Sequence, residues 1–410
     1  MRVLISGTAG AGGWPAPDCG CASCARVTPG RRPTSVTLGG PAAPDDLLVL
    51  GGPAAPGDSP PPADGPAAPD GPVRLPLSGP PPPGYRASTG PDGLTVTTPG
   101  GRRVLYAASS PPPPSPYDES PFGESPRGES PRDGRGRRAG DTGDAGEALD
   151  LVLLDVLDRP ERLGDLRRRG LVGERTHVVA VGVDHRVATE AELARRAALW
   201  GVRVVPDGTV VDTGGPPPAP ASPPRRTLLL GGSRSGKSAE AELRLAAEPE
   251  VLYVATGPSG DGDPEWLRRV RAHRDRRPAH WRTAETTGLA GLLRSADTPL
   301  LIDGLGTWVA AVFDECDAWP GGTGGTGKND GGGGTGENAV AARCDDLVAA
   351  WRQTRVRVVA VSDEVGLGVV PGTASGRMFR DTLGRLNQRL ALESEDVTLV
   401  VAGRLLPLPI

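Results

Sequence analysis

This 410-residue sequence has few aromatic residues, no long apolar run and a small net charge. Phe, Trp and Tyr make up only 3% of the chain, but hydrophobic residues reach 37%, which is enough for one or two cores. No run approaches the roughly 18 apolar residues that a membrane-spanning helix needs. The formal net charge is −4, so the overall composition favours binding neither to nucleic acid nor to an anionic membrane.

Cysteine is also scarce, and its number is odd. Three of the five cysteines lie within six residues, which argues against a disulfide framework and favours reduced thiols or a metal site. The apolar run after Met1 is shorter than the hydrophobic region of a signal peptide. We therefore expect a cytoplasmic protein.

Glycine and proline, in contrast, are abundant, with 60 Gly and 46 Pro, and they concentrate in four stretches. Residues 39–84 and 109–146 contain short repeated units such as Gly-Pro-Ala-Ala-Pro. We interpret both as disordered insertions, because units so short and polar cannot bury a face. Residues 214–224 predict a Pro-rich linker and residues 321–336 a flexible Gly-rich loop.

Two patterned regions remain, and both predict an α/β fold. Residues 1–213 predict a β-rich layered domain, whose last strand would cover residues 202–205. Residues 225–410 alternate apolar strand runs with helical stretches. That alternation indicates a mostly parallel sheet flanked by helices.

A phosphate-binding loop is the clearest motif. It fits G-x4-G-K-S, follows an apolar strand and precedes a helix-forming segment, which argues against the alternative of a Gly-rich turn that arose by chance. Lys237 would reach the β- and γ-phosphates, and Ser238 would ligate Mg²⁺. The predicted nucleotide-binding residues of this loop are Gly231, Gly232, Ser233, Arg234, Ser235, Gly236, Lys237 and Ser238.

Two further positions carry candidate chemistry. Asp303 ends an apolar run, where a carboxylate of a nucleotide-binding site would bind Mg²⁺. His273 lies in an arginine-rich segment, where a neutral imidazole could act as a nucleophile on phosphorus. The same segment could instead be a solvated basic helix end with an incidental histidine, and spacing alone does not separate these alternatives.

Seven ordered segments of residues 226–410 carry a resemblance to a known family. They are the phosphate-binding loop and residues 253–256, 269–281, 283–285, 302–308, 361–371 and 379–388. The region resembles the bifunctional adenosylcobinamide kinase / adenosylcobinamide-phosphate guanylyltransferase family of cobalamin biosynthesis. The resemblance implies a P-loop NTPase-like fold and a homo-oligomer, a trimer. Asp363 stands where asparagine is usual, and Gly304 and Gly306 replace bulkier residues.

The resemblance also implies a reaction and its residues. Adenosylcobinamide would be phosphorylated with ATP or GTP, and GMP would then pass from GTP to the product through a covalent adduct of His273, giving adenosylcobinamide-GDP. His273 and Lys237 would be catalytic. Further residues implied to contact nucleotide or metal are Thr256, Gly257, Arg274, Asp275, Arg276, Arg277, Glu285 and Asp303.

The amino-terminal region begins with a strand, a Gly-rich turn and a Cys-x-Cys-x2-Cys group. A dinucleotide-binding fingerprint is excluded, because the segment Trp14-Pro-Ala-Pro forbids a helix directly after the turn. The region resembles metallo-β-lactamase-fold phosphodiesterase-like proteins, which implies an αββα domain.

Hydrolases of that fold bind two metals through a His-x-His-x-Asp-His cluster. Residues 1–224 contain only His177 and His185, and Gly182 stands where a ligand histidine would be expected. We therefore predict a degenerate domain without catalysis. A structural Cys3His zinc site could still form, the alternative being three reduced, partly buried thiols. Its ligands would be Cys19, Cys21, Cys24 and His185.

Two other functions remain open at the level of sequence. The first domain could keep a metal-dependent phosphoesterase activity, which would make the chain a fusion of a kinase and a hydrolase. The whole chain could instead be a nucleotide-binding regulator without enzymatic activity.

Overall fold

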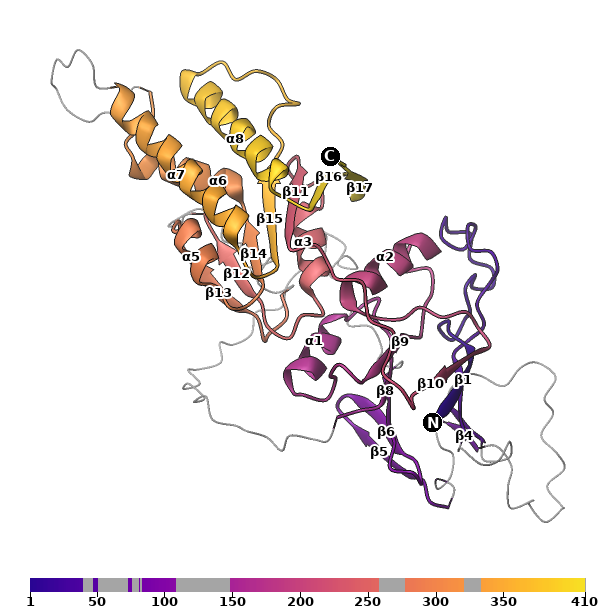
Figure 1. Ribbon diagram of the computed structural model, residues 1–410. Coiled ribbons are helices and arrows are strands. Elements are labelled where there is room, and N and C mark those ends of the chain that lie inside the picture. The colour runs from indigo at the N-terminus through magenta and orange to yellow at the C-terminus, as the bar shows by residue number, and fades with distance from the viewer. Residues whose placement is uncertain are drawn as a thin grey trace, which may run out of the picture. The chain divides into compact units, whose positions relative to one another are not determined.

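The computed structural model describes residues 1–39, 47–50, 73–75, 81, 83–107, 148–257, 277–320 and 333–409. The chain divides into two compact units, Met1–Pro220 (unit 1) and Ala221–Ile410 (unit 2), each with its own sheets (Figure 1). The division lies inside the Pro-rich stretch 214–224. None of the described helices is long and apolar enough to cross a membrane.

Unit 1 contains two five-stranded sheets. The first sheet has the order β10 (Thr209–Asp212), β1 (Arg2–Gly7), β2 (Ser35–Gly39), β3 (Leu47–Leu50) and β4 (Val73–Leu75). The second has the order β5 (Arg86–Gly90), β6 (Gly93–Thr97), β7 (Arg103–Ala107), β8 (Leu151–Leu154) and β9 (His177–Ala180). Pairing is antiparallel from β10 to β3 and from β5 to β7, and parallel in the remaining pairs.

The two sheets of unit 1 share one core. Ile5 of β1, Leu38 of β2 and Leu151 of β8 are buried in the same apolar cluster, so one face of each sheet packs against the other. All four residues of β8 are buried, which means that the second face of its sheet is covered as well. Helices α1 (Glu161–Arg168) and α2 (Glu190–Trp200) follow β8 and β9, and each has a buried apolar side, formed by Leu163 and Leu166 in α1 and by Leu193 and Trp200 in α2.

Two sequence predictions for unit 1 need correction. Residues 39–84 are not wholly a disordered insertion, because β3 and β4 lie within them; their Leu and Val patches pair through backbone hydrogen bonds that composition does not reveal. Residues 202–205 form a single bridge from Arg203 to Val179 instead of a strand. The αββα arrangement stays a prediction: it needs helices over both sheets, and in the described part of unit 1 the helices are α1 and α2, which follow strands of the same sheet. Residues 109–146 lie outside the described residues.

Unit 2 is built on one seven-stranded sheet. Its order is β13 (Arg282–Glu285), β12 (Leu252–Ala255), β14 (Leu300–Asp303), β15 (Val358–Asp363), β11 (Arg226–Gly231), β16 (Asp396–Val401) and β17 (Arg404–Pro407). All neighbours are parallel except β16 and β17. The predicted mostly parallel sheet is confirmed.

Helices cover both faces of this sheet. On one face, α3 (Lys237–Leu245) packs its Ala241 and Leu245 against Leu229 and Leu301. The other face shares a larger core with α5 (Leu289–Ser295), α6 (Leu305–Glu315), α7 (Gly333–Gln353) and α8 (Ala374–Leu392). Such burial on both faces explains the continuous apolar runs of the central strands.

The predicted flexible loop 321–336 is too long by four residues, because α7 begins at Gly333. A Cβ at Gly336 would lie 3.1 Å from the carbonyl oxygen of Cys316. Glycine therefore allows this helical turn to pack closely on the end of α6, a tertiary effect that a Gly-rich sequence does not indicate. Residues 321–332 lie outside the described residues.

Helix α2 offers a test of local stability in unit 1. The Thr189 hydroxyl accepts a hydrogen bond from the backbone N–H of Glu192 at 3.1 Å and so caps the helix. Thr189→Ala should lower the free energy of unfolding of unit 1 by about 1 kcal/mol in chemical denaturation. Thr189→Ser keeps the acceptor and should lose much less; equal losses would contradict the capping role.

Candidate functional site

The polar residues of unit 2 collect at the edge of the sheet where the parallel strands end. Gly231, the last residue of β11, lies opposite Asp363, the last residue of β15. Asp303 ends the next strand, β14, and lies opposite Val361. Open parallel sheets bind ligands outside the carboxyl ends of their strands. A ligand here would meet the loops that follow β11, β14 and β15.

The phosphate-binding loop joins β11 directly to α3. Two of its residues adopt left-handed backbone conformations, Arg234 with φ 57° and Gly236 with φ 101°. A Cβ at Gly231 would lie 2.6 Å from both Ser235 Oγ and the carbonyl oxygen of Val400, so only glycine fits there. The turn leads into the amino-terminal end of α3, whose free N–H groups favour an anion.

Lys237 opens α3, and its ammonium group lies between two oxygens. It donates a hydrogen bond to the Gly232 carbonyl at 3.0 Å and forms an ion pair with Asp363 Oδ1 at 2.8 Å. A Cβ at Gly306 would lie 2.5 Å from Asp363 Oδ2. The absence of a side chain at Gly306 therefore leaves the space that this carboxylate occupies. Gly306 and Asp363, two positions where the sequence departs from the family that it resembles, are thus neighbours in the structure.

Asp303 is held by two hydroxyl groups. Ser238 Oγ donates to its Oδ1 at 3.1 Å, and the Tyr253 hydroxyl donates to its Oδ2 at 2.5 Å. Burial, together with the charge of Asp303, raises the pKa of Tyr253, so the phenol stays protonated and remains a donor. Hydroxyl and carboxylate oxygens are ligands that Mg²⁺ prefers, and Ser238 and Asp303 fit that ion in chemistry and in position.

Of the other predicted site residues, the structure describes Arg277, Thr256, Gly257 and Glu285. Arg277 lies over the ring of Tyr253, with its guanidinium carbon 3.2 Å from the ring centroid. Thr256 is buried and donates to the Gly304 carbonyl at 2.6 Å, and Gly257 follows it. Glu285 ends β13 opposite Ala255 and is exposed. Outside the described residues lie His273, Arg274, Asp275 and Arg276.

Two residues of the site were missed by sequence reasoning. Asp363 ends an apolar strand run, the same signal that identified Asp303, and it could have been found in that way. Tyr253 lies inside a strand, and nothing in the local sequence distinguishes it from an ordinary core aromatic.

The fold and the site together define unit 2 as a P-loop nucleotide-binding domain of the α/β class. The sequence profile of the cobinamide kinase / cobinamide phosphate guanyltransferase family matches residues 227–408. The chain belongs to this family.

Three relatives carry the match. The chain is 39% identical over 186 residues to the bifunctional adenosylcobalamin biosynthesis protein CobU of Salmonella typhimurium, covering 43% of this chain and 95% of that protein. It is 42% identical over 191 residues to the protein CobP of Pseudomonas aeruginosa (45% and 96%) and 37% identical over 186 residues to CobU of Escherichia coli (43% and 95%). A solved type III secretion ATPase also matches at 14% identity over 43% of this chain and 50% of that one, but its TM-score of 0.27 carries no weight.

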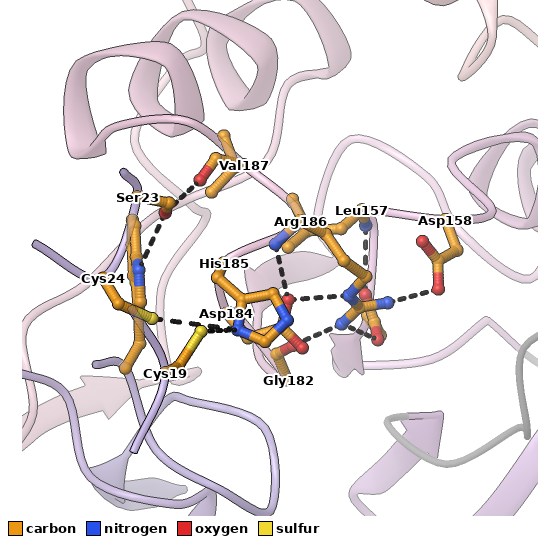
Figure 2. A network of polar contacts seen from close by, with 12 residues as sticks. Cys19, Ser23, Cys24, Leu157, Asp158, Gly182, Asp184, His185, Arg186 and Val187 are labelled. Carbon is orange, nitrogen blue, oxygen red and sulfur yellow. Dashed lines mark hydrogen bonds and ion pairs between the residues drawn. The ribbon is translucent and has the colours of Figure 1, made fainter. Parts of the chain in front are cut away.

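In unit 1, the three clustered cysteines and His185 lie together (Figure 2). One possible ligand atom from each lies within 4.8 Å of the others, and the Sγ atoms of Cys19 and Cys24 are each 3.8 Å from His185 Nδ1. In a tetrahedral site with Zn–S bonds of about 2.3 Å, sulfur and nitrogen ligands are about 3.6 Å apart, so the spacing fits Zn²⁺. A hydrogen bond from the Cys24 backbone N–H lowers the pKa of Cys21, whereas desolvation raises the pKa of Cys24.

Arg186 lies next to this cluster, and Figure 2 shows its side chain turned away from the cysteines toward Asp158. The guanidinium forms ion pairs with Asp155 at 2.8 Å, with Asp184 at 2.7 Å and with Asp158, and it donates to the Gly182 carbonyl at 2.8 Å. Gly182 has φ 70°, a conformation that a histidine would rarely adopt. Arg186 thus provides a fixed positive charge among three carboxylates.

Nucleotide binding tests the site in unit 2. Lys237→Ala should weaken binding of a fluorescent GTP analogue about 10- to 100-fold, because a hydrogen bond to a charged group is worth about 1.5–3 kcal/mol. Asp363→Asn keeps the size of the side chain but removes a charge that competes with phosphate for Lys237, and it should tighten binding a few-fold. An unchanged affinity of Lys237→Ala for the GTP analogue would show that the phosphates bind elsewhere.

Proposed function

We propose that this chain phosphorylates adenosylcobinamide and then converts the product to adenosylcobinamide-GDP. The observation that carries the proposal is the convergence of Lys237, Ser238 and Asp303 at the carboxyl edge of the parallel sheet. Membership of the cobinamide kinase / cobinamide phosphate guanyltransferase family supplies the substrate class. ATP or GTP serves as phosphoryl donor and GTP as guanylyl donor.

In the kinase step, the acceptor hydroxyl attacks the γ-phosphorus of the bound triphosphate. An O–P bond forms, the bond from the γ-phosphorus to the β–γ bridging oxygen breaks, and the hydroxyl proton is released to solvent. Lys237 leaves Asp363 for the phosphates and, with the N–H groups of the loop, neutralises the leaving nucleoside diphosphate. Mg²⁺ bound at Ser238 and Asp303 would add charge neutralisation at the β- and γ-phosphates.

In the guanylylation step, His273 is the nucleophile. Its imidazole attacks the α-phosphorus of GTP, an N–P bond to GMP forms, and pyrophosphate leaves. The phosphate of the cobinamide intermediate then attacks the same phosphorus, and the histidine is released. Arg277, four residues beyond His273 in the sequence, lies against Tyr253, whose hydroxyl binds Asp303, and this contact of a described residue supports the proposal.

The proposed role of His273 allows the kinase activity to be separated from the guanylylation activity. His273→Asn removes the nucleophile of the second step but no group that a direct attack on the γ-phosphorus needs. We expect this variant to make adenosylcobinamide phosphate but to form neither the acid-labile GMP adduct, detected by mass spectrometry, nor adenosylcobinamide-GDP. His280→Asn is the matched control and should form both. A GMP adduct on His273→Asn would assign the nucleophile to another residue.

For unit 1 we infer a zinc-stabilised domain related to the metallo-β-lactamase fold that does not hydrolyse phosphodiesters. Two observations support this inference. The histidines of residues 1–224 are both engaged, since His185 faces the cysteines and His177 is buried with its Nε2 3.0 Å from the Gly215 carbonyl oxygen. Arg186 already neutralises the nearby carboxylates, which are therefore not free to bind a pair of divalent metals. A closed Cys3His site is structural, because it leaves no position open for substrate.

Zinc content tests the inference for unit 1. The purified chain should contain about one zinc per molecule by elemental analysis, and Cys21→Ser should lose it with a lower unfolding midpoint of unit 1 and unchanged transferase activity. Cys316→Ser, a cysteine of unit 2, is the matched control and should keep the metal. Wild-type protein that folds without zinc would contradict the inference that zinc stabilises unit 1.

A further inference from the structure

Tyr253 occupies a position that the two proposed reaction steps do not use. Its side chain is 3% exposed, its hydroxyl binds Asp303, and its ring supports Arg277. We propose that Tyr253 is a positioning residue that fixes the metal-binding carboxylate of Asp303 and the guanidinium of Arg277, and so serves the kinase and the guanylylation reactions at once. This proposal rests on the nucleotide site proposed above.

The hydroxyl group of Tyr253 prevents rotation of the Asp303 carboxylate. Ser238 holds Oδ1 and Tyr253 holds Oδ2, so both oxygens have a fixed donor. A metal ion bound here would share the Ser238 hydroxyl, whose lone pair would face the ion while its proton stays directed at Asp303 Oδ1. The bond from Tyr253 comes from the neighbouring strand, where Ala255 lies opposite Asp303, and does not depend on the ion. It is therefore a contact that orients the carboxylate whether or not metal is bound.

The ring of Tyr253 fixes Arg277 in a different way. Within the described part of the chain, Arg277 Nε is buried without a hydrogen-bond partner, and one terminal nitrogen lies 3.5 Å from Thr283 Oγ1. The guanidinium carbon lies 3.2 Å from the ring centroid, so the Tyr253 ring is a close support for Arg277 within the described residues. A guanidinium held by its flat face can direct its terminal N–H groups at a phosphate, which they bind in two-point contacts.

A purely structural role is the competing explanation, since Tyr253 also packs in a cluster with Leu229, Leu301 and Trp281. Two variants separate the roles of the hydroxyl and the ring. Tyr253→Phe removes the hydroxyl and keeps the ring and its volume. Tyr253→Leu removes both. Tyr106→Phe, at a half-buried tyrosine of β7 in unit 1, is the control for the loss of a phenol hydroxyl.

The experiment measures Mn²⁺ binding to the GTP-bound protein by electron paramagnetic resonance, GTP affinity without metal, and kinase rate against Mg²⁺ concentration. Tyr253→Phe should weaken Mn²⁺ binding about tenfold, the lower end of the effect of losing a hydrogen-bond partner of a metal ligand. Its GTP affinity without metal should stay within about twofold, and saturating Mg²⁺ should restore kcat. Tyr253→Leu should in addition weaken metal-free GTP binding about three- to tenfold, because the stacking contact is lost. Tyr106→Phe should match the wild type.

Wild-type Mn²⁺ affinity in Tyr253→Phe would overturn the proposal. So would variants that lower only the thermal unfolding midpoint, because that is the result expected of a packing residue. Tyr253→Phe decides the question even if Tyr253→Leu does not fold. Failure of the underlying nucleotide site gives a different result, since Lys237→Ala would then bind GTP as tightly as the wild type.

Discussion

The position of β15 between β11 and β14 is the constraint on which the site of unit 2 depends. Parallel pairing in this order places the end of β11 opposite Asp363 and brings Asp303 one strand further along the same edge. Lys237 and Ser238, in the first turn of α3, then meet a different carboxylate each. The same strands are buried on both faces by helices, so the backbone that sets these distances has little freedom to move.

The parts of the site that sequence could predict are those encoded locally. The phosphate-binding loop is contiguous, and Asp303 follows an apolar run, so both were found from spacing and pattern. The contact between Asp363 and Gly306 and the bond from Tyr253 to Asp303 join different elements across the sheet, and they depend on strand register, which no local pattern contains. Strands β3 and β4 were missed for the same reason, since short Leu and Val patches form strands only when a partner is present.

The turn at residues 184–186 shows how one short segment joins two kinds of chemistry in unit 1. Its histidine faces soft sulfur ligands, while the residues before and after it belong to a network of hard carboxylates and a guanidinium. His185 was linked to the cysteines from sequence although it lies 166 residues from Cys19, because residues 1–224 offer only two histidines. Arg186 was not recognised, since an arginine beside aspartates is common on any surface.

The absence of a side chain at position 306 and the conformation of Asp363 depend on each other. Because the carboxylate of Asp363 lies where a Cβ at 306 would be, an aspartate at 363 in this orientation is compatible only with glycine in the first turn of α6. A larger residue at 306 would have to move the carboxylate that pairs with Lys237, and asparagine at 363, which has the size of aspartate, would meet the same obstacle. The residue at 306 therefore affects whether the side chain at 363 can keep its contact with Lys237.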